Sequence, residues 1–269
     1  MKQTKSLLPV VSEEDINRYW DMQKTMLEND VFCAEDLLAP FTEEEKKLLL
    51  SPSRCDQIEA LCHRKKDPIR RLFFTQNGEI VGFVMYCIYV SEDGKCFVLD
   101  FYVMPHLRCQ GAGSAFFALF KEQAMREGAV YFELNTHCVR ALRFWKRQGF
   151  LENGTDDAGV ILLCLPPKEQ GTFVRVEHPD LSDADILWQV RKLINGWRNK
   201  QGESAVTDEE MEQLCKSAAQ GTASLLLVRR GYRVVGMRLM QDGMCKAEFV
   251  EPVFDCKAVE RLLSACSEQ

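Results

Sequence analysis

The segment Arg108-Cys109-Gln110-Gly111-Ala112-Gly113 has the residue types of an anion-binding loop. It follows an apolar run that ends at Val103 and leads into an amphipathic stretch at residues 114–127. A glycine-rich loop that begins a helix presents unpaired backbone N–H groups and the positive end of the helix dipole. Without side chains, Gly111 and Gly113 would let an anion approach the backbone and would allow conformations closed to other residues. We therefore expect a phosphate or pyrophosphate to bind here.

The absence of other phosphate-binding motifs narrows the choice of ligand. No Gly-Lys-Ser/Thr completes a Walker A sequence, and Phe116 stands where the dinucleotide fingerprint has its third glycine. No Gly-x-Ser-x-Gly nucleophile elbow surrounds Ser114. Kinases, dehydrogenases and serine hydrolases are therefore disfavoured.

A second motif follows at residues 141–150, after a predicted strand at residues 131–134. It reads Ala-Leu-Arg-Phe-Trp-Lys-Arg-Gln-Gly-Phe, with Gly149 suited to a helix C′ position. The first motif, Arg108-x-x-Gly111-x-Gly113, resembles the Arg/Gln-x-x-Gly-x-Gly/Ala loop of the GNAT N-acetyltransferase superfamily. The second is similar to that family's Ala-x-x-Phe-Tyr-x-x-x-Gly-Phe. The resemblance covers about residues 6–166 and respects the order of elements.

This resemblance implies acetyl-coenzyme A (acetyl-CoA) as the acyl donor and direct attack by an amine on its thioester. Backbone N–H groups of residues 108–113 would hold the pyrophosphate, and the strand around residues 101–103 would pair with the pantetheine arm where it diverges from the strand at residues 131–134. No metal is implied. The residues expected to contact the cofactor are Phe101, Val103, Arg108, Cys109, Gln110, Gly111, Ala112, Gly113, Ser114, Asn135, Phe144 and Trp145.

Asp100 is the candidate base for this chemistry. An alkyl amine is mostly protonated at pH 7, so its proton needs an acceptor, and a backbone N–H near Val103 would stabilise the oxyanion. Asp100 lies in an otherwise apolar strand, and strand alternation places it on one face with Tyr102. Two other interpretations stay open: this face of the strand is simply the more solvent-exposed one, or Asp100 pairs with Arg70 or Arg71.

Two departures from the family pattern concern the acid that protonates the leaving thiolate. Trp145 stands where many members have a tyrosine, and its indole N–H cannot serve as that acid. Cys138 stands where many have an asparagine, although Asn135 could compensate. Tyr102, His137, Cys138 or solvent could supply the proton. The alternative function is therefore a CoA-binding or assembly module with weak or no catalysis.

The surrounding elements predict a mixed α/β fold with a mixed sheet, in the order strand, two helices, three strands, helix, strand, helix, two strands. Ser12 with Asp15 and Thr42 with Glu45 mark helix starts. Asn77-Gly78 and Asp93-Gly94 mark turns between strands. Strands are expected at residues 7–11, 71–75, 80–89, 96–104 and 131–134, and helices follow Ser12 and cover residues 42–50, 56–65 and 114–127.

The chain beyond residue 167 reads as a truncated copy of the first part. Residues 225–237 parallel residues 72–83, and residues 249–252 parallel residues 102–105. We place the boundary near Lys168, giving a GNAT domain at residues 1–167 and a truncated one at residues 168–269. The copy has no glycine after Pro252, and Asp255 would repel a phosphate there. A last helix is expected at residues 258–266. Two roles are open for Trp188, Arg191, Trp197 and Arg198, which have helical spacing: they could line an acceptor pocket or pack in the core. The spacing favours core packing.

The composition sets the remaining limits. The 269 residues carry a net charge of −6 with no basic stripe, so no nucleic-acid partner is expected. The sequence contains no apolar run long enough to span a membrane, so we expect a cytoplasmic protein. We expect it to be a monomer or homodimer that acts on a small-molecule or peptide amine. The 12 cysteines contain no Cys-x-x-Cys pair, so neither a metal site nor a disulfide framework is favoured, and most are expected to be small buried hydrophobes.

Overall fold

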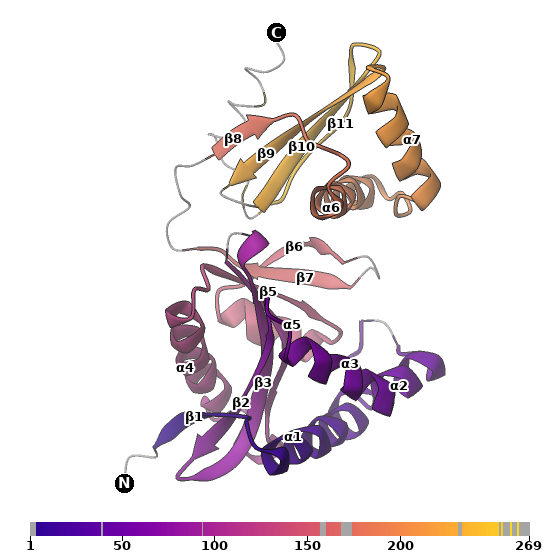
Figure 1. The fold of residues 1–269 in the computed structure, drawn as a ribbon. Coiled ribbons are helices and arrows are strands. Elements are labelled where there is room, and N and C mark those ends of the chain that lie inside the picture. The colour runs from indigo at the N-terminus through magenta and orange to yellow at the C-terminus, as the bar shows by residue number, and fades with distance from the viewer. Residues whose placement is uncertain are drawn as a thin grey trace. The chain divides into compact units, whose positions relative to one another are not determined.

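A computed structural model describes residues 4–38, 40–92, 94–156, 160–167, 174–230, 233–252, 254, 259 and 263 (Figure 1). The chain divides into two compact units, Met1–Val90 with Gly94–Gly149, and Ser91–Asp93 with Phe150–Gln269. The boundary that we predicted near Lys168 lies outside the described residues.

A seven-stranded mixed sheet has the strand order β1-β2-β3-β4-β5-β7-β6. The predicted order of elements is confirmed, and the three helical stretches expected between residues 12 and 65 all form, one more than the summary order of two helices counted. The elements are β1 (Lys5–Pro9), α1 (Glu13–Met26), the π-helix η1 (Leu27–Val31), α2 (Glu43–Leu49), α3 (Pro52–Cys62), β2 (Ile69–Gln76), β3 (Glu79–Tyr89), η2 (Val90–Glu92), β4 (Lys95–Val103), η3 (Pro105–Leu107), α4 (Ala112–Arg126), β5 (Tyr131–Thr136), α5 (Val139–Arg147), β6 (Leu151–Thr155) and β7 (Ile161–Leu165).

Local signals explain where the N-terminal helices begin. Both predicted capping boxes form, Ser12 with Asp15 at α1 and Thr42 with Glu45 at α2. Helix α3 begins at Pro52, four residues before the predicted start, because the Ser51 hydroxyl accepts a hydrogen bond from the N–H of Arg54 and Pro52 favours the first helical turn.

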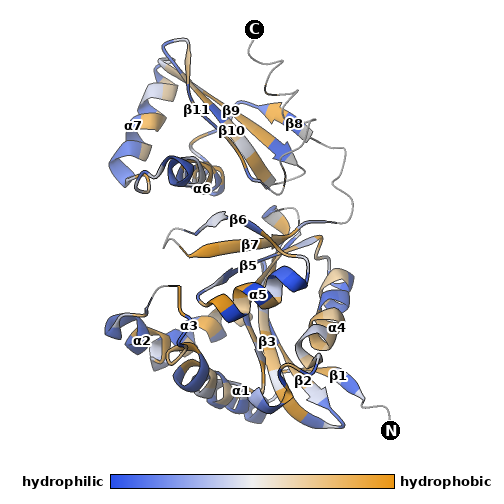
Figure 2. Cartoon of the chain, turned by 180° about the vertical axis from the view of Figure 1, so that it is seen from behind, coloured by the Kyte–Doolittle hydropathy of each residue, from blue (hydrophilic) through white to orange (hydrophobic). Residues whose placement is uncertain are grey.

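The sheet of the first unit carries helices on both faces (Figure 1). Helices α1 to α3 cover one face, whose buried cluster includes Tyr19, Phe73, Phe83 and Tyr102. On the other face, α4 and α5 bring aromatic rings against Phe101. Figure 2 shows the central strands mostly in hydrophobic colours, as expected of a sheet buried on both faces.

The β2–β3 hairpin and its neighbour set the position of the strand that carries Asp100. Asn77 (φ 54°) and Gly78 (φ 87°) form the turn, as the Asn-Gly signal predicted. A Cβ on Gly82 would lie 2.2 Å from the carbonyl oxygen of Tyr102, so only glycine allows β3 and β4 to approach this closely.

The second unit contains a four-stranded sheet in the order β11-β10-β9-β8. Besides β6 and β7, this unit contains β8 (Val174–Glu177), α6 (Ala184–Gln201), α7 (Asp208–Ala219), β9 (Ala223–Arg230), β10 (Arg233–Gln241) and β11 (Met244–Val250). The succession of one strand, helices and three antiparallel strands repeats that of β1 to β4, which agrees with a truncated second copy. In the predicted last helix, only Val259 and Leu263 are described, and Asp255 lies outside the described residues.

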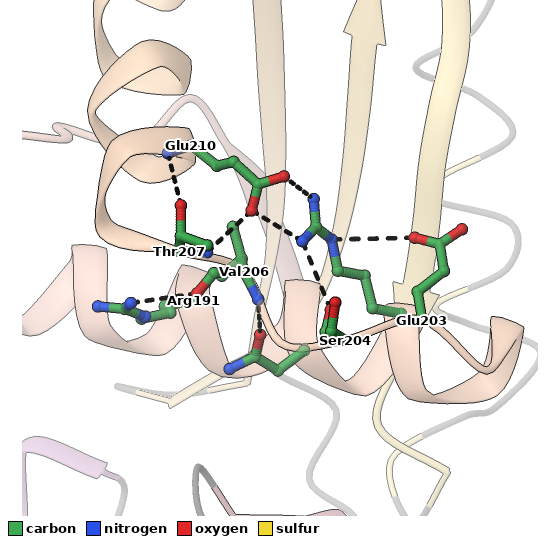
Figure 3. Close-up of polar contacts among 8 residues, drawn as sticks. Arg191, Glu203, Ser204, Val206, Thr207 and Glu210 are labelled. Atoms are coloured by element: carbon green, nitrogen blue, oxygen red, sulfur yellow. Dashed lines mark hydrogen bonds and ion pairs between the residues drawn. The ribbon is translucent and has the colours of Figure 1, made fainter.

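The junction of α6 and α7 is held by a polar network (Figure 3). Thr207 and Glu210 form a capping box at the start of α7. The Glu210 carboxylate also accepts hydrogen bonds of 2.8 and 2.7 Å from the Arg198 guanidinium, which lowers the pKa of Glu210 to about 2. A cavity of 160 Å³ adjoins this network, with Trp197, Arg198 and Met211 in its lining. Arg198 is thus neutralised by protein, whereas Trp188 is 45% exposed.

Candidate functional site

The strands β4 and β5 diverge at the centre of the first unit. Their parallel pairing runs from Lys95 to Phe97 on β4, and the last described pair is Phe97 with Glu133. The N–H of Met104 donates to the carbonyl of Val81 on β3 at 2.9 Å. Because backbone groups alternate along a strand, the N–H groups of Phe101 and Val103 point away from β3, toward the side where β5 has separated. The far half of β4 therefore has an edge that an extended ligand can pair with.

The loop between β4 and α4 ends in a helix start without a side-chain cap. Gly111 is the N-cap with φ 79°, a left-handed conformation, and Cys109 has φ 60°. The first backbone bond of the helix is from the N–H of Ala115 to the carbonyl of Gly111, at 3.1 Å. No side chain caps the preceding N–H groups of this 15-residue helix, and a Cβ on Gly111 would meet open space. This donor set fits a phosphate.

Gly113 serves the packing of two helices. A Cβ at this position would lie 3.1 Å from the ring of Phe144 on α5. The missing side chain therefore lets α4 and α5 pack closely, a reason that the glycine spacing alone did not reveal.

Arg108 connects the loop to neighbouring elements through its side chain. Its Nε donates to the carbonyl of Val103 at 2.7 Å, and its Nη1 and Nη2 donate to the Asp30 carboxylate at 2.8 and 2.7 Å. Hydrogen bonding to Arg108 lowers the pKa of Asp30. The guanidinium lies 5.3 Å from the ring centre of Tyr102. Arg108 is thereby fixed by protein groups, which leaves the backbone of its loop to receive an anion.

Asp100 lies on the face of β4 that α1 covers. A bulge at Leu99 interrupts the register between β3 and β4. The Tyr19 hydroxyl donates to Oδ2 of Asp100 at 3.3 Å, and the Gln23 amide donates to the same oxygen at 2.9 Å. Burial raises the pKa of Asp100, and the Gln23 hydrogen bond only partly opposes this effect. The carboxylate is therefore a stronger base than an exposed aspartate.

The predicted shared face of Asp100 and Tyr102 is confirmed, since the strand partners of both, Met85 and Phe83, lie in one core cluster with Tyr102. The alternative pairing of Asp100 with Arg70 or Arg71 is wrong. Arg70 pairs with Glu127 at 2.6 Å, and Arg71 pairs with Glu59 at 2.5 Å.

The second motif forms α5 and the turn before it. Cys138 is the N-cap residue, and its backbone bridges to Leu37. Asn135, near the end of β5, is partly buried, and the ring of His137 lies 4.8 Å from that of Phe41. Gly149 has φ 93° just after the helix, as predicted for a C′ glycine.

Trp145 and Phe144 point into the aromatic cluster of the sheet. Trp145 is 6% exposed, and its ring lies 5.2 Å from that of Phe101 and 5.3 Å from that of Phe117. The Phe144 ring stacks on Phe101 at 5.9 Å. These contacts place both residues behind the strand edge, next to the start of α4.

Sequence reasoning missed three residues near the site: Tyr19, Gln23 and Asp30. Tyr19 and Gln23 lie four positions apart on α1, with both side chains buried. A glutamine at a buried position was the available signal, because a buried amide requires a hydrogen-bonding partner. Asp30 gave no such signal.

Comparison with known proteins finds a family model that matches part of this chain. The sequence profile of the acetyltransferase (GNAT) family matches residues 32–150. An uncharacterized N-acetyltransferase, YhfO, from Bacillus subtilis (strain 168) is 32% identical over 99 residues. The alignment covers 35% of this chain and 64% of that relative, so the chain spans just under two thirds of its length.

Solved structures that match this chain include the PaiA N-acetyltransferase from Thermoplasma acidophilum in complex with coenzyme A. It is 15% identical, with a TM-score of 0.45, and the match covers 62% of this chain and 99% of that one. A tandem GNAT protein from the clavulanic acid biosynthesis pathway is 13% identical, with a TM-score of 0.40 and coverage of 98% and 85%. Among the described residues, no helix has the length and apolar character needed to cross a membrane.

Proposed function

We propose that this chain is an acetyl-CoA-dependent N-acetyltransferase that acts on a primary amine of a small molecule or peptide, since the model of the acetyltransferase (GNAT) family matches residues 32–150. The observation that carries the proposal is the juxtaposition of three features on one strand, β4. These are an edge left open by β5, the uncapped start of α4 beyond its end, and the partly buried carboxylate of Asp100.

The residues of the loop suit the binding of acetyl-CoA. The backbone N–H groups of residues 111–114 would receive the pyrophosphate at the start of α4, where Gly111 leaves space for it. The outward N–H groups of Phe101 and Val103 would hold the extended arm along β4. When bound, acetyl-CoA supplies the acetyl thioester that the amine attacks.

Asp100 is the proposed proton acceptor. Its raised pKa suits the removal of a proton from an ammonium group, and the donors Tyr19 and Gln23 hold its Oδ2 in place. The N–H of Val103 lies on the open edge of the same strand and would stabilise the charge that develops on the acetyl oxygen.

The proton for the departing thiolate has several possible sources. Trp145 offers none, because an indole N–H is not an acid. Burial raises the pKa of Tyr102, so its hydroxyl stays protonated at neutral pH but is a weaker acid than an exposed tyrosine. We assign this role to Tyr102 or to solvent, with Cys138 and His137 as further candidates.

The second unit has an alanine at the position that corresponds to Asp100. Gly82 pairs with Val103 in the first sheet, and Gly236 pairs with Val250 in the second. Counting back three residues from each valine sets Asp100 against Ala247. We therefore assign acetyl transfer to the first unit alone.

A thiol-release assay tests the proposed function. The chain is given acetyl-CoA with polyamines, aminoglycosides and amino acids, and acetylated products are identified by mass spectrometry. Thiol release that depends on an acceptor supports the proposal. The buried Trp145 favours a second candidate, a coenzyme A-binding module without catalysis. Saturable acetyl-CoA binding with no turnover on any acceptor would favour that candidate.

A further inference from the structure

The cavity of 160 Å³ in the second unit has a mostly apolar lining. The apolar residues come from α6, α7, the loop between these helices and β10, and they are Ile194, Trp197, Val206, Met211, Leu214 and Leu239. An apolar cavity of about 150 Å³ can hold a benzene ring. Transfer of a ring from water to such a lining is favourable, because it removes apolar surface from water. The cavity therefore has the size and lining of a site for a small apolar group.

Hydrogen bonds hold the walls of this cavity in place (Figure 3). The N–H of Val206 donates to the side-chain oxygen of Asn195 at 2.9 Å, and the carbonyl of Val206 accepts from Arg191 at 3.1 Å. Arg198 on α6 donates to Glu210 on α7 at 2.8 and 2.7 Å. The loop between the helices and the first turn of α7 are fixed by these contacts. A ligand would thus enter a site whose shape is largely set beforehand, as is usual for small-molecule sites.

A β-bulge directs Lys246 toward the same cavity. Leu239 of β10 pairs with Ala247 of β11. The next residue, Met240, pairs with Cys245, so Lys246 is the extra residue of the bulge. Neighbouring residues of a regular strand point to opposite faces, whereas a bulge re-aims a side chain. The bulge explains why Lys246 and Ala247 both line the cavity.

The first unit has the corresponding bulge at Leu99, one residue before Asp100. Ala247 takes the position of Asp100 in the second unit, and the bulge is again one residue earlier. The second copy therefore keeps the bulge but has a methyl group where the first has a carboxylate. Glu210 also lines the cavity, but its bonds to Arg198 lower its pKa to about 2, so it is a weak base. This site is suited to binding rather than to proton removal.

The charges of the lining leave one cation for a ligand. Arg198 and Glu210 balance each other. Lys246 has no hydrogen bond or ion pair with any residue that the structure describes. Its neighbour Glu248 is paired with Arg238 instead. Because Lys246 is exposed, its ammonium group is accessible to a ligand from solvent.

We propose that the second unit binds a small monocarboxylate whose apolar part, about the size of a phenyl ring, fills this cavity and whose carboxylate pairs with Lys246. Such a site is additional to the proposed acetyl transfer and would exist without it. One unpaired ammonium balances one negative charge, whereas a phosphate monoester carries nearly two at neutral pH. A long alkyl chain would exceed the volume of the cavity and leave apolar surface in water.

Three probes that share a phenyl ring and differ in charge test the proposal: phenylacetate, phenylacetamide and phenethylamine. Calorimetric titration of the full chain, without acetyl-CoA, should give a Kd of about 0.1–1 mM for phenylacetate, in keeping with about ten non-hydrogen atoms. The amide should bind about three- to fivefold more weakly, as expected of an ion pair in contact with water, and the amine more weakly still. In Lys246→Met the acid should bind no better than the amide, whose Kd should not change. Lys216→Met is the control, because Lys216 is an exposed lysine of α7 outside the lining, and it should keep the preference.

The methyl group of Met211 reports the place of binding. With isotope-labelled methionine methyl groups, the ring protons of phenylacetate should show nuclear Overhauser contacts to Met211, whose signal is assigned with Met211→Leu. Ala247→Leu enlarges a side chain of the lining and should weaken the binding of acid and amide alike by at least about tenfold. The Overhauser contacts are measured on the parent chain, so they test the location even where Ala247→Leu is destabilised.

Other outcomes overturn the proposal. Equal affinity of the parent chain for acid and amide would show that Lys246 does not select the ligand. Loss of the preference in Lys216→Met as well would show a general effect of charge. Contacts of phenylacetate to other methionines alone, undiminished binding in a folded Ala247→Leu, or no saturable binding at about 10 mM would each show that the cavity is not the site.

Discussion

Replacement of Asp100 by asparagine separates catalysis from folding at the proposed site. Oδ2 of Asp100 accepts the hydrogen bonds from Tyr19 and Gln23. An asparagine has nearly the same shape, and its carbonyl oxygen can accept both bonds. The substitution therefore preserves the contacts of the side chain and removes its ability to take a proton.

The magnitude follows from the role. General base catalysis contributes about 10²–10⁴-fold to a rate, so kcat for Asp100→Asn should fall by that factor, equivalent to about 2.7–5.4 kcal/mol. The Kd for acetyl-CoA should not change, because the side chain lies on the face covered by α1, away from the loop before α4.

The burial of Asp100 determines the direction in which the pH dependence and the stability of the same variant should change. Burial raises the pKa of Asp100 above its ordinary value of 3.8. In the parent, kcat/KM should therefore decline as the pH falls through that raised value, and the variant should lack this limb. A raised carboxylate pKa means that ionisation at neutral pH disfavours the folded state, so the free energy of unfolding at pH 7 should not decrease in the variant.

Stopped-flow thiol release, calorimetric titration with acetyl-CoA and chemical denaturation measure these three quantities. Asp21→Asn is the matched control, because Asp21 is an exposed carboxylate on α1 and its removal should change none of them. An unchanged kcat in Asp100→Asn would refute the role of Asp100 as the base. A large loss of acetyl-CoA affinity would equally contradict the geometry described for β4.

Three further substitutions test the supporting contacts. Gly113→Val forces a side chain into the aromatic ring beside it, and the free energy of unfolding should fall by about 1–3 kcal/mol in chemical denaturation; no change would contradict the helix packing. Gln23→Leu removes a donor to the Asp100 carboxylate, so the pKa of Asp100 should rise further and the acid limb of kcat/KM should move to higher pH; a shift to lower pH would contradict this. Asp30→Asn breaks the partly buried pair with Arg108 and should lower the free energy of unfolding by about 1–3 kcal/mol at pH 7. Because the folded pKa of Asp30 lies below its ordinary value of 3.8, the difference from the parent should vanish only as the pH falls through that lowered value.

Local sequence signals predicted the elements that carry the site. The glycine loop, the two capping boxes and the Asn77-Gly78 turn each depend on neighbouring residues, and each forms as expected. The prediction from strand alternation that Asp100 and Tyr102 share one face of β4 is also confirmed, because the bulge at Leu99 lies before both residues.

The contacts that define the site chemically join residues far apart in the chain. Gln23 reaches Asp100 across 77 positions, and Asp30 reaches Arg108 across 78. Such pairs depend on how helices pack against the sheet, which periodicity does not encode. The 12-residue helix α7 was also missed, although Thr207 and Glu210 have capping-box spacing.

Hydrogen–deuterium exchange of the full chain with and without coenzyme A tests the central claim most directly. Our account predicts that saturating coenzyme A slows exchange at the N–H groups of Phe101, Val103 and residues 111–114, which face the open strand edge and the uncapped helix start. The amides of α7 should not change. Protection confined to other segments, or no protection at saturating coenzyme A, would contradict the account.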